Sequence, residues 1–203
     1  MLQIKQLQVL RDQKLLKYDF QLQQGKTLAV QGLSGVGKST LLQVIAGFVA
    51  AEKGSVLWHG QSLLELPVEQ RPVSYLFQQN NLFEHLSVIQ NLMLGFADDT
   101  DQDQLLDKLV NAAIELQVDK QLEKKPTELS GGQRQRIAII RTLLRPEPII
   151  LLDEPFAELD PTTRSLATQW VADIAKQQNK TILMVTHQSE DVQQLADEIL
   201  QLQ

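Results

Sequence analysis

The chain has 203 residues, enough for one large domain or two small ones, and its 43% hydrophobic content is sufficient for a buried core. A net charge of −6 argues against a surface built mainly to bind nucleic acid, and the lack of cysteine excludes disulfides, thiolate metal sites and cysteine nucleophiles. We find neither a signal-peptide core nor an apolar run of the roughly 20 residues that span a bilayer, so we expect any contact with a membrane to pass through a partner.

Short strands are predicted for the first part of the chain. Leu16, Tyr18, Phe20 and Leu22 alternate with polar residues, which favours a strand with one buried and one exposed face. The apolar run 27–31 then predicts a strand buried in the core.

A glycine-rich loop follows that buried strand and precedes a helical pattern at 41–45. Its glycines let successive backbone N–H groups point at phosphate oxygens, and the new helix adds the positive end of its dipole. Lys38 supplies a mobile positive charge for the β- and γ-phosphates, and the hydroxyl of Ser39 is placed to bind Mg²⁺. A turn that only caps a helix is the alternative, but the strand–loop–helix context favours a nucleoside triphosphate site. The residues predicted to hold the phosphates are Gly32, Leu33, Ser34, Gly35, Val36, Gly37, Lys38, Ser39 and Thr40.

Strands continue after the helix that follows this loop. Gly47 is expected to end the helix, and two further strands are predicted at 55–60 and 73–77. The second of these strands leads into a cluster of polar amides, Gln78, Gln79, Asn80 and Asn81.

The next part of the chain has helical spacing. It runs from Ser87 to about Ala97, with Ser87 and Gln90 in the positions of a capping box. The acidic segment 98–101, which we interpret as a solvated loop, separates it from an amphipathic helix at 105–116. Together with the helix described next, these segments predict a helical subdomain at about 86–145.

The sequence Leu-Ser-Gly-Gly-Gln at 129–133 opens another helix, which ends at the proline-rich segment 145–148. The apolar run 149–152 is typical of a parallel strand buried on both faces, and it ends in Asp153 and Glu154. The alternation of strands and helices predicts an α/β fold with a parallel sheet.

The last part of the chain repeats this alternation. Asp160 has the position of a helix N-cap, with proline at the first helical residue. A core strand is predicted at 181–185, followed by His187, a helix that begins at Ser189, and a short strand at 199–202.

Polar residues follow four of the predicted strands. They are the phosphate loop, Gln78, the pair Asp153 and Glu154, and His187. Because an open parallel sheet gathers functional residues beyond the carboxyl ends of its strands, we expect these groups to share one site. Alone, Gln78 fits a loop residue and His187 a structural histidine, whereas two carboxylates at the end of a buried strand require a cation or a proton-transfer role.

With these motifs in this order, the chain resembles the ATP-binding-cassette ATPases along nearly its whole length. The segment 129–133 matches the signature loop of that family. The resemblance implies a single domain, 1–203, with a P-loop NTPase (RecA-like) parallel-sheet core, an N-terminal antiparallel β portion and a helical signature subdomain. It also implies ATP and Mg²⁺ as cofactors, and two copies of the chain that enclose two ATP molecules head to tail.

The same resemblance implies a role for each matching residue. Ser39, Gln78 and Asp153 contact the metal, Glu154 is the general base that polarises the attacking water, and His187 contacts the γ-phosphate. The γ-phosphate held by the second copy is gripped by the signature loop, and the two sites are linked through Asp160; the residues concerned are Ser130, Gly131, Gly132, Gln133 and Asp160.

One position departs from the family pattern. Many relatives have an aromatic residue near position 11 that stacks on adenine, whereas Arg11 is present here. The guanidinium plane of arginine can also stack on a base, so discrimination between ATP and GTP is expected to be loose.

A cassette ATPase needs membrane partners, and the resemblance implies permease subunits, a periplasmic solute-binding protein reached through them, no nucleic acid, and a place at the cytoplasmic face of the inner membrane. Leu82, Phe83 and Leu86 fit either a docking groove for the permease or the core of the subdomain. The segments around 71–86 and 151–161 are similar to the ATPase subunits of bacterial thiamine importers.

Other functions are left open by these motifs. The alternatives are importers of the polyamine, iron, molybdate or sulfate type, a cassette ATPase that acts on nucleic acid or ribosomes, and a small P-loop kinase. A kinase would have no use for the signature loop, and a single acidic cassette does not favour a nucleic-acid factor.

Overall fold

The computed structural model describes residues 1–79, 81–96 and 100–203, and within these residues the strands form two sheets. The first sheet is antiparallel and contains β1 (Leu2–Arg11), β2 (Lys14–Leu22), β4 (Lys53–Trp58) and β5 (Gln61–Ser62) in the order β2-β1-β4-β5. Tyr18 and Leu22 are buried in β2 while Lys17 and Asp19 are exposed, so the predicted alternation is confirmed.

The second sheet is parallel and carries the residues of interest at one edge. Its strands are β3 (Thr27–Gln31), β6 (Val73–Leu76), β7 (Ile149–Asp153), β8 (Thr181–Val185) and β9 (Glu198–Gln201), in the order β6-β7-β8-β3-β9. Every residue of β7 and β8 is buried, as continuous apolar runs predict. Because the strands are parallel, the carboxyl ends of β3, β6, β7 and β8 lie at the same edge.

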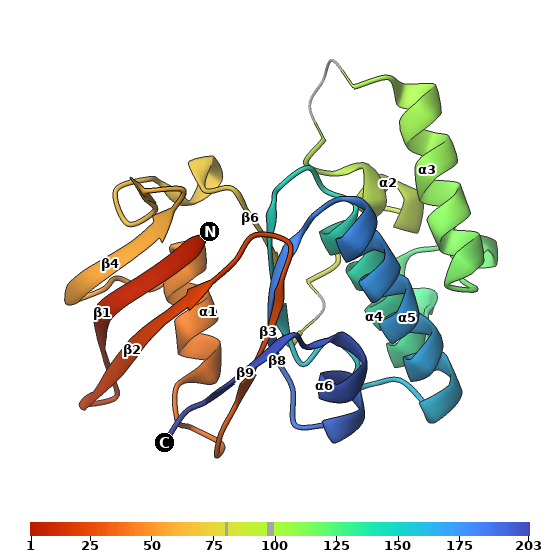
Figure 1. The fold of residues 1–203 in the computed structure, drawn as a ribbon. Helices are drawn as coiled ribbons and strands as arrows, with labels where there is room; N and C mark the ends of the chain where they lie inside the picture. Colours follow the sequence, from red (N-terminus) through yellow and green to blue (C-terminus); the bar gives the residue numbers. More distant parts are fainter. Residues whose placement is uncertain (80, 97–99) are drawn as a thin grey trace.

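Helix α1 (Lys38–Ala46) joins the two sheets into one core. Figure 1 shows it between the antiparallel strands and the parallel sheet, and its apolar side chains belong to one buried cluster with residues of both sheets. The helix ends at Gly47, whose φ of 96° is the left-handed conformation that favours glycine, as expected from the sequence.

The other helices cover the opposite face of the parallel sheet and extend beyond it (Figure 1). They are α2 (Val88–Met93), α3 (Gln102–Glu115), α4 (Gly131–Leu143), α5 (Pro161–Gln177) and α6 (Ser189–Leu195). Elsewhere in the described residues, short 3₁₀ turns lie at Val68–Gln70, Asp119–Gln121 and Pro126–Glu128. No helix of the described ranges is long and apolar enough to cross a membrane.

The helix that begins after Ser87 is shorter than predicted. The expected capping box between Ser87 and Gln90 is present, but α2 ends at Met93. Leu94 adopts an extended conformation and Gly95 a left-handed one with φ of 83°, so the helical pattern continues in sequence without a helix. Asn80, Ala97, Asp98 and Asp99, which took part in our predictions, lie outside the described residues.

Candidate functional site

The phosphate loop joins β3 to α1, and the antiparallel sheet holds it in place. Gly37 has a φ of 105°, and a Cβ atom there would lie 2.6 Å from the Tyr18 hydroxyl and 2.7 Å from Cδ1 of Leu16. The same hydroxyl donates a 2.8 Å hydrogen bond to the carbonyl of Gly37. Burial raises the pKa of Tyr18 to about 12, so its hydroxyl remains a donor at physiological pH. Glycine at position 37 therefore permits a close contact that fixes the loop.

Lys38 begins α1 and folds back over the loop. Its ammonium group is largely buried and donates hydrogen bonds of 2.9 Å to the carbonyls of Gly32 and Leu33. These carbonyls hold a positive charge at the N-terminal end of α1, where the helix dipole is also positive. The arrangement concentrates positive potential where an anionic group would be stabilised.

A cavity of about 420 Å³ brings the predicted groups together from four strands. Gln78 reaches it from beyond β6, Glu154 from β7 and His187 from β8. Its lining from the phosphate loop and α1 consists of Ser34, Gly35, Gly37, Lys38, Ser39 and Thr40. The other predicted loop residues, Gly32, Leu33 and Val36, line a neighbouring cavity that His187 also borders. The volume and the polar lining suit a small charged ligand.

Asp153 ends β7 as a buried carboxylate, with 4% of its surface exposed. It accepts hydrogen bonds from the hydroxyl of Ser39 and from that of Tyr75, the latter with 3.4 Å between Oη and Oδ2. Burial raises the pKa of Asp153, and these two hydrogen bonds oppose that change. The carboxylate thus joins the start of α1 to the edge of β6.

Glu154 has a backbone conformation that few glutamates adopt, with a φ of 51°. Its N–H donates to the carbonyl of Val185 at 2.9 Å, which holds this turn against β8. The side chain lines the cavity, and its Oε1 lies 3.3 Å from Nε2 of His187. Strained backbone of this kind is typical of residues whose side chains must be aimed.

The side chains around Asp153 fit a small hard cation. In residues 1–79, 81–96 and 100–203, no group of three or more His, Cys, Asp or Glu side chains could hold a metal ion by itself. Mg²⁺ prefers oxygen ligands and is usually bound by one or two protein groups together with phosphate oxygens. The hydroxyl of Ser39 contacts the carboxylate of Asp153, and Ser39 lines the same cavity as the amide of Gln78. These oxygen donors match that preference.

The signature loop lies apart from this cavity. Ser130 is the exposed N-cap of α4: its hydroxyl accepts from the N–H of Gln133 at 3.3 Å, and its own N–H donates to Oε1 of Gln133 at 3.0 Å. A Cβ atom on Gly131 would meet the carboxylate of Glu158, so the loop packs against the segment after Glu154. None of the signature residues at 130–133 lines the cavity that contains Lys38.

Asp160 is likewise outside the cavity. Its carboxylate caps α5 by accepting 3.1 Å hydrogen bonds from the N–H groups of Thr162 and Thr163. Hydrogen bonds from Thr163 and Thr162 lower the pKa of Asp160. The structure therefore brings the phosphate loop together with Gln78, Glu154 and His187 in one cavity. Residues 130–133 and Asp160 lie outside that cavity.

Two contacts of the site were not predicted from the sequence. Tyr75 reaches Asp153, and Gln135, buried in α4, donates to the carbonyl of Pro155 next to Glu154. The sequence signal for Tyr75 is its position on β6 in register with Leu151 of β7, which becomes visible only when the order of the strands is known.

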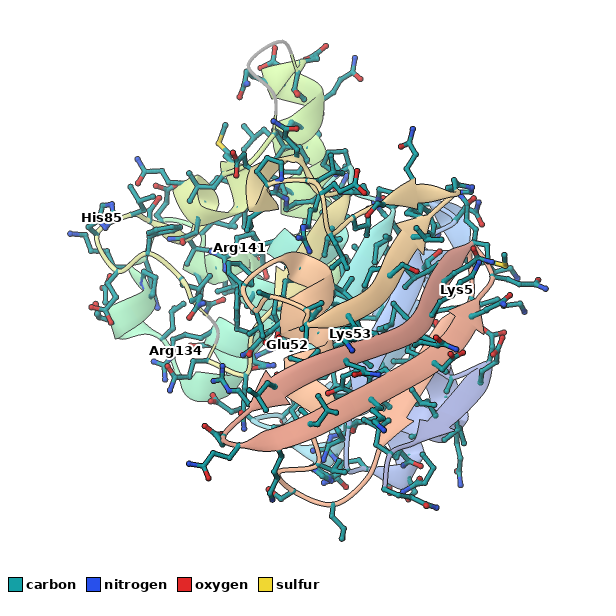
Figure 2. The ribbon with its side chains drawn as sticks, turned by 90° about the vertical axis from the view of Figure 1, so that its left-hand side faces the viewer. Lys5, Glu52, Lys53, His85, Arg134 and Arg141 are labelled. Atoms are coloured by element: carbon teal, nitrogen blue, oxygen red, sulfur yellow. The ribbon has the colours of Figure 1, made fainter. Side chains whose placement is uncertain are left out.

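A separate groove of about 400 Å³, which we call the aromatic groove, lies beside this cavity. It is lined by rings that include Phe48, Tyr75, Phe77 and Phe83, and by arginines of and after α4. Figure 2 shows Arg141 and Arg134 extending from α4 on the side of the molecule where His85 lies, while Lys5 and Lys53 lie over the antiparallel sheet. Phe83 is exposed and lines this groove, whereas Leu82 packs partly buried against the core.

Comparisons with known proteins agree with this geometry. A family model described as ABC transporter matches residues 15–157. The thiamine import ATP-binding protein ThiQ of Photorhabdus laumondii is 41% identical over 98% of this chain and 86% of its own length. ThiQ of Aliivibrio fischeri is 43% identical over 90% of this chain and 78% of its own. A solved structure, described as the dimeric structure of the bacterial ABC transporter cassette MJ0796, covers all of this chain and 94% of its own, with a TM-score of 0.87 and 25% identity.

Proposed function

We infer that this chain is the ATP-hydrolysing subunit of a bacterial thiamine importer. The chain belongs to the ABC transporter family and is an ATPase of that family. The observation that carries the chemistry is the single cavity in which the phosphate loop, Gln78, Glu154 and His187 meet. The cargo is inferred from likeness to thiamine import ATP-binding proteins, since an ATPase subunit does not itself contact the solute.

In this proposal the residues of the phosphate loop bind the nucleotide. The loop amides and Lys38 hold the phosphates, and Ser39, Asp153 and Gln78 supply the oxygen ligands of Mg²⁺. When bound, Mg²⁺ neutralises charge on the β- and γ-phosphate oxygens. The hydrogen bond between Ser39 and Asp153 supports this assignment, because it places two oxygen donors side by side at the start of α1.

Glu154 acts as the general base. Its carboxylate lines the cavity on the side of His187 and takes a proton from a water that Gln78 orients. His187 donates to the γ-phosphate and, at 3.3 Å from Glu154, keeps the carboxylate directed into the cavity. The left-handed backbone at Glu154 is the feature of the chain that aims this base.

The active form in this proposal is a dimer with two ATP molecules at its interface. The signature residues 130–133 form the exposed start of α4, where backbone N–H groups can bind an anion, yet they do not reach the cavity of their own chain. A second copy brings them to the γ-phosphate. Asp160 then links the two sites, and the MJ0796 cassette is described as a dimer.

We assign the aromatic groove to the membrane partner. Its exposed rings and its arginines suit a short helix from the cytoplasmic side of a permease. The chain would therefore work at the cytoplasmic face of the inner membrane, and a periplasmic solute-binding protein would reach it only through the permease. Residues 86–145 are proposed to form the helical subdomain that moves with the permease.

Uptake of labelled thiamine tests the proposal. Cells that lack this chain are complemented with the wild type, with Glu154→Gln, or with Glu123→Gln, a matched substitution at an exposed residue of the helical region. We expect concentrative uptake with the wild type and Glu123→Gln and none with Glu154→Gln. If thiamine uptake does not depend on the chain, the cargo is wrong, and polyamines, iron, molybdate and sulfate should be tested next.

A further inference from the structure

Tyr75 lines the aromatic groove and contacts Asp153, the residue before Glu154 of the ATP cavity. Its ring lines the groove, and its hydroxyl donates to Oδ2 of Asp153 across 3.4 Å. The register of the sheet explains this reach. Tyr75 pairs with Leu151, so Asp153 lies two residues further along β7 on the same face, about 6–7 Å away along the strand. A tyrosine side chain spans that distance, and phenylalanine would end before it.

An aromatic stack connects Tyr75 to the surface. The rings of Tyr75 and Phe77 are stacked with centroids 4.1 Å apart and an interplanar angle of 26°, and Phe77 is in turn 5.3 Å from Phe48. Phe48 is 54% exposed at the edge of the groove. A segment that fills the groove must contact these rings, and rings that are stacked so closely cannot move independently.

The position of Asp153 depends on few hydrogen bonds. Its side-chain donors are Ser39 and Tyr75. An ionised carboxylate only accepts hydrogen bonds, so the phenol of Tyr75 is the donor in this pair. A shift of the Tyr75 ring would remove one of these two donors and leave the carboxylate freer to rotate.

We propose that Tyr75 is a positioning residue that relays the state of the aromatic groove to Asp153, so that displacement of the stack weakens divalent metal binding in the ATP cavity. The proposal rests on the proposed function only in taking Asp153 as a ligand of Mg²⁺ and the groove as the permease site. It adds a route between the two sites that runs through side chains of β6 and β7.

Binding of Mn²⁺ in the presence of ADP, measured by electron paramagnetic resonance, tests the first step without turnover. We expect Tyr75→Phe to raise the dissociation constant of Mn²⁺ about fivefold, because a hydrogen bond to a charged group is lost. Binding of ADP without metal should stay unchanged, and the melting temperature reports that the variant is folded. A dissociation constant within twofold of the wild type, or a lower one, would overturn the proposal.

A double-mutant cycle tests the relay itself. Phe77→Ala should weaken Mn²⁺ binding when Tyr75 is present and should have no further effect in combination with Tyr75→Phe. Ile114→Ala, an exposed apolar residue of α3 outside both cavities, serves as the control and should not alter Mn²⁺ binding. Equal effects of Phe77→Ala in both backgrounds would refute a relay through the hydroxyl. The uptake experiment uses neither the Tyr75 nor the Phe77 variant. The relay can therefore be refuted while the proposed function stands, and the reverse also holds.

Discussion

Arg11 lies where the ATP cavity meets the turn between β1 and β2, and it lines that cavity together with Asp12 and Lys14. Among the described residues, the lining of this cavity includes no Phe, Tyr or Trp side chain. A purine bound here would therefore rest against a guanidinium plane, which stacks on any base without reading its edge. Specificity for the base must then be weak.

We predict that the wild type uses ATP and GTP with KM values that differ by less than about threefold, and that Arg11→Tyr lowers the KM for ATP. Base–aromatic stacking is worth about 1–3 kcal/mol, so a severalfold decrease in KM is expected, with kcat unchanged because the catalytic groups are untouched. Steady-state hydrolysis of both nucleotides measures this. A wild type that rejects GTP more than tenfold would contradict it.

Residue positions were predictable from the sequence where local pattern decides them. The alternation around Tyr18 placed that side chain in the core, Asp160 was identified as a helix cap, and a helix was predicted to open at 129–133, where Ser130 is the cap. What the pattern could not supply was the second role of a buried side chain. The hydroxyl of Tyr18 supports Gly37, and Tyr75 contacts Asp153, which is 78 residues away in the chain. Such contacts depend on strand order, which single-residue preferences do not encode.

At the scale of elements, α4 and the turn after β7 form one mechanical unit. Gln135 is 1% exposed, and its side-chain amide donates to the carbonyl of Pro155, directly after Glu154. The guanidinium of Arg164 contacts the same turn through a 3.1 Å hydrogen bond to the carbonyl of Phe156. The helix that begins with the signature loop is thereby connected to the backbone that aims Glu154, the proposed general base.

We predict that Gln135→Met, which retains the length of the side chain but removes its donor, lowers kcat about tenfold and changes the KM for ATP less than twofold. The buried carbonyl of Pro155 loses its partner, at a cost of about 1–3 kcal/mol, and the Glu154 turn relaxes. Steady-state kinetics separate the two parameters. Gln177→Met, at an exposed position of α5, is the matched control. A raised KM with normal kcat would assign Gln135 to nucleotide binding.

Lys180 joins two further elements at the opposite edge of the parallel sheet. Its buried ammonium group, just before β8, donates to the carbonyls of Arg145 at 2.5 Å and Glu147 at 2.8 Å, in the connection between α4 and β7. Burial lowers the pKa of Lys180 from 10.5 to about 8; Glu147 opposes that shift and Lys108 adds to it. Between these two pH values the unfolded chain binds the proton more firmly than the folded one.

Stability should therefore rise with pH in that window. We predict that the free energy of unfolding of the wild type, relative to Lys180→Met, increases by about 2 kcal/mol between pH 8 and pH 10.5, and that it is flat below pH 7. Urea unfolding at several pH values measures the difference, in which the titration of other residues cancels. If this difference in the free energy of unfolding does not depend on pH, burial does not destabilise the protonated form of Lys180, and the prediction is wrong.

Element boundaries followed from the sequence where a stop signal was unambiguous. Gly47 ends α1 as expected, and the run 149–152 forms the first four residues of the buried strand β7. The helix after Ser87 was extended too far, because its apolar spacing continues past Met93 although Leu94 is extended and Gly95 left-handed. Backbone conformation overrode periodicity at that point, and a glycine inside a helical pattern is the warning that could have shortened the prediction.

At the scale of the whole molecule, the signature loop is separate from the cavity, and this separation is the basis of the proposed two-chain ATP site. One chain provides Lys38, Glu154 and His187 in a single cavity, whereas Ser130 at the start of α4 is exposed and does not line that cavity. The parallel sheet and the order of the motifs could be inferred from the sequence. That two groups of motifs lie at separate places in one chain is a property of the packing, which only the structure displays.

We predict, on this ground, that Glu154→Gln dimerises when ATP is added and binds two nucleotides per dimer. Loss of the base keeps ATP intact, so the interface stays closed around both nucleotides. Because a symmetric dimer uses each patch twice, one substitution disrupts both sites. Ser130→Arg in the Glu154→Gln chain should therefore remain monomeric while each monomer still binds ATP. Light scattering and nucleotide titration measure these quantities together. A Glu154→Gln chain that binds ATP tightly yet stays monomeric would mean that its own residues complete the site, and the exposed start of α4 would need another ligand.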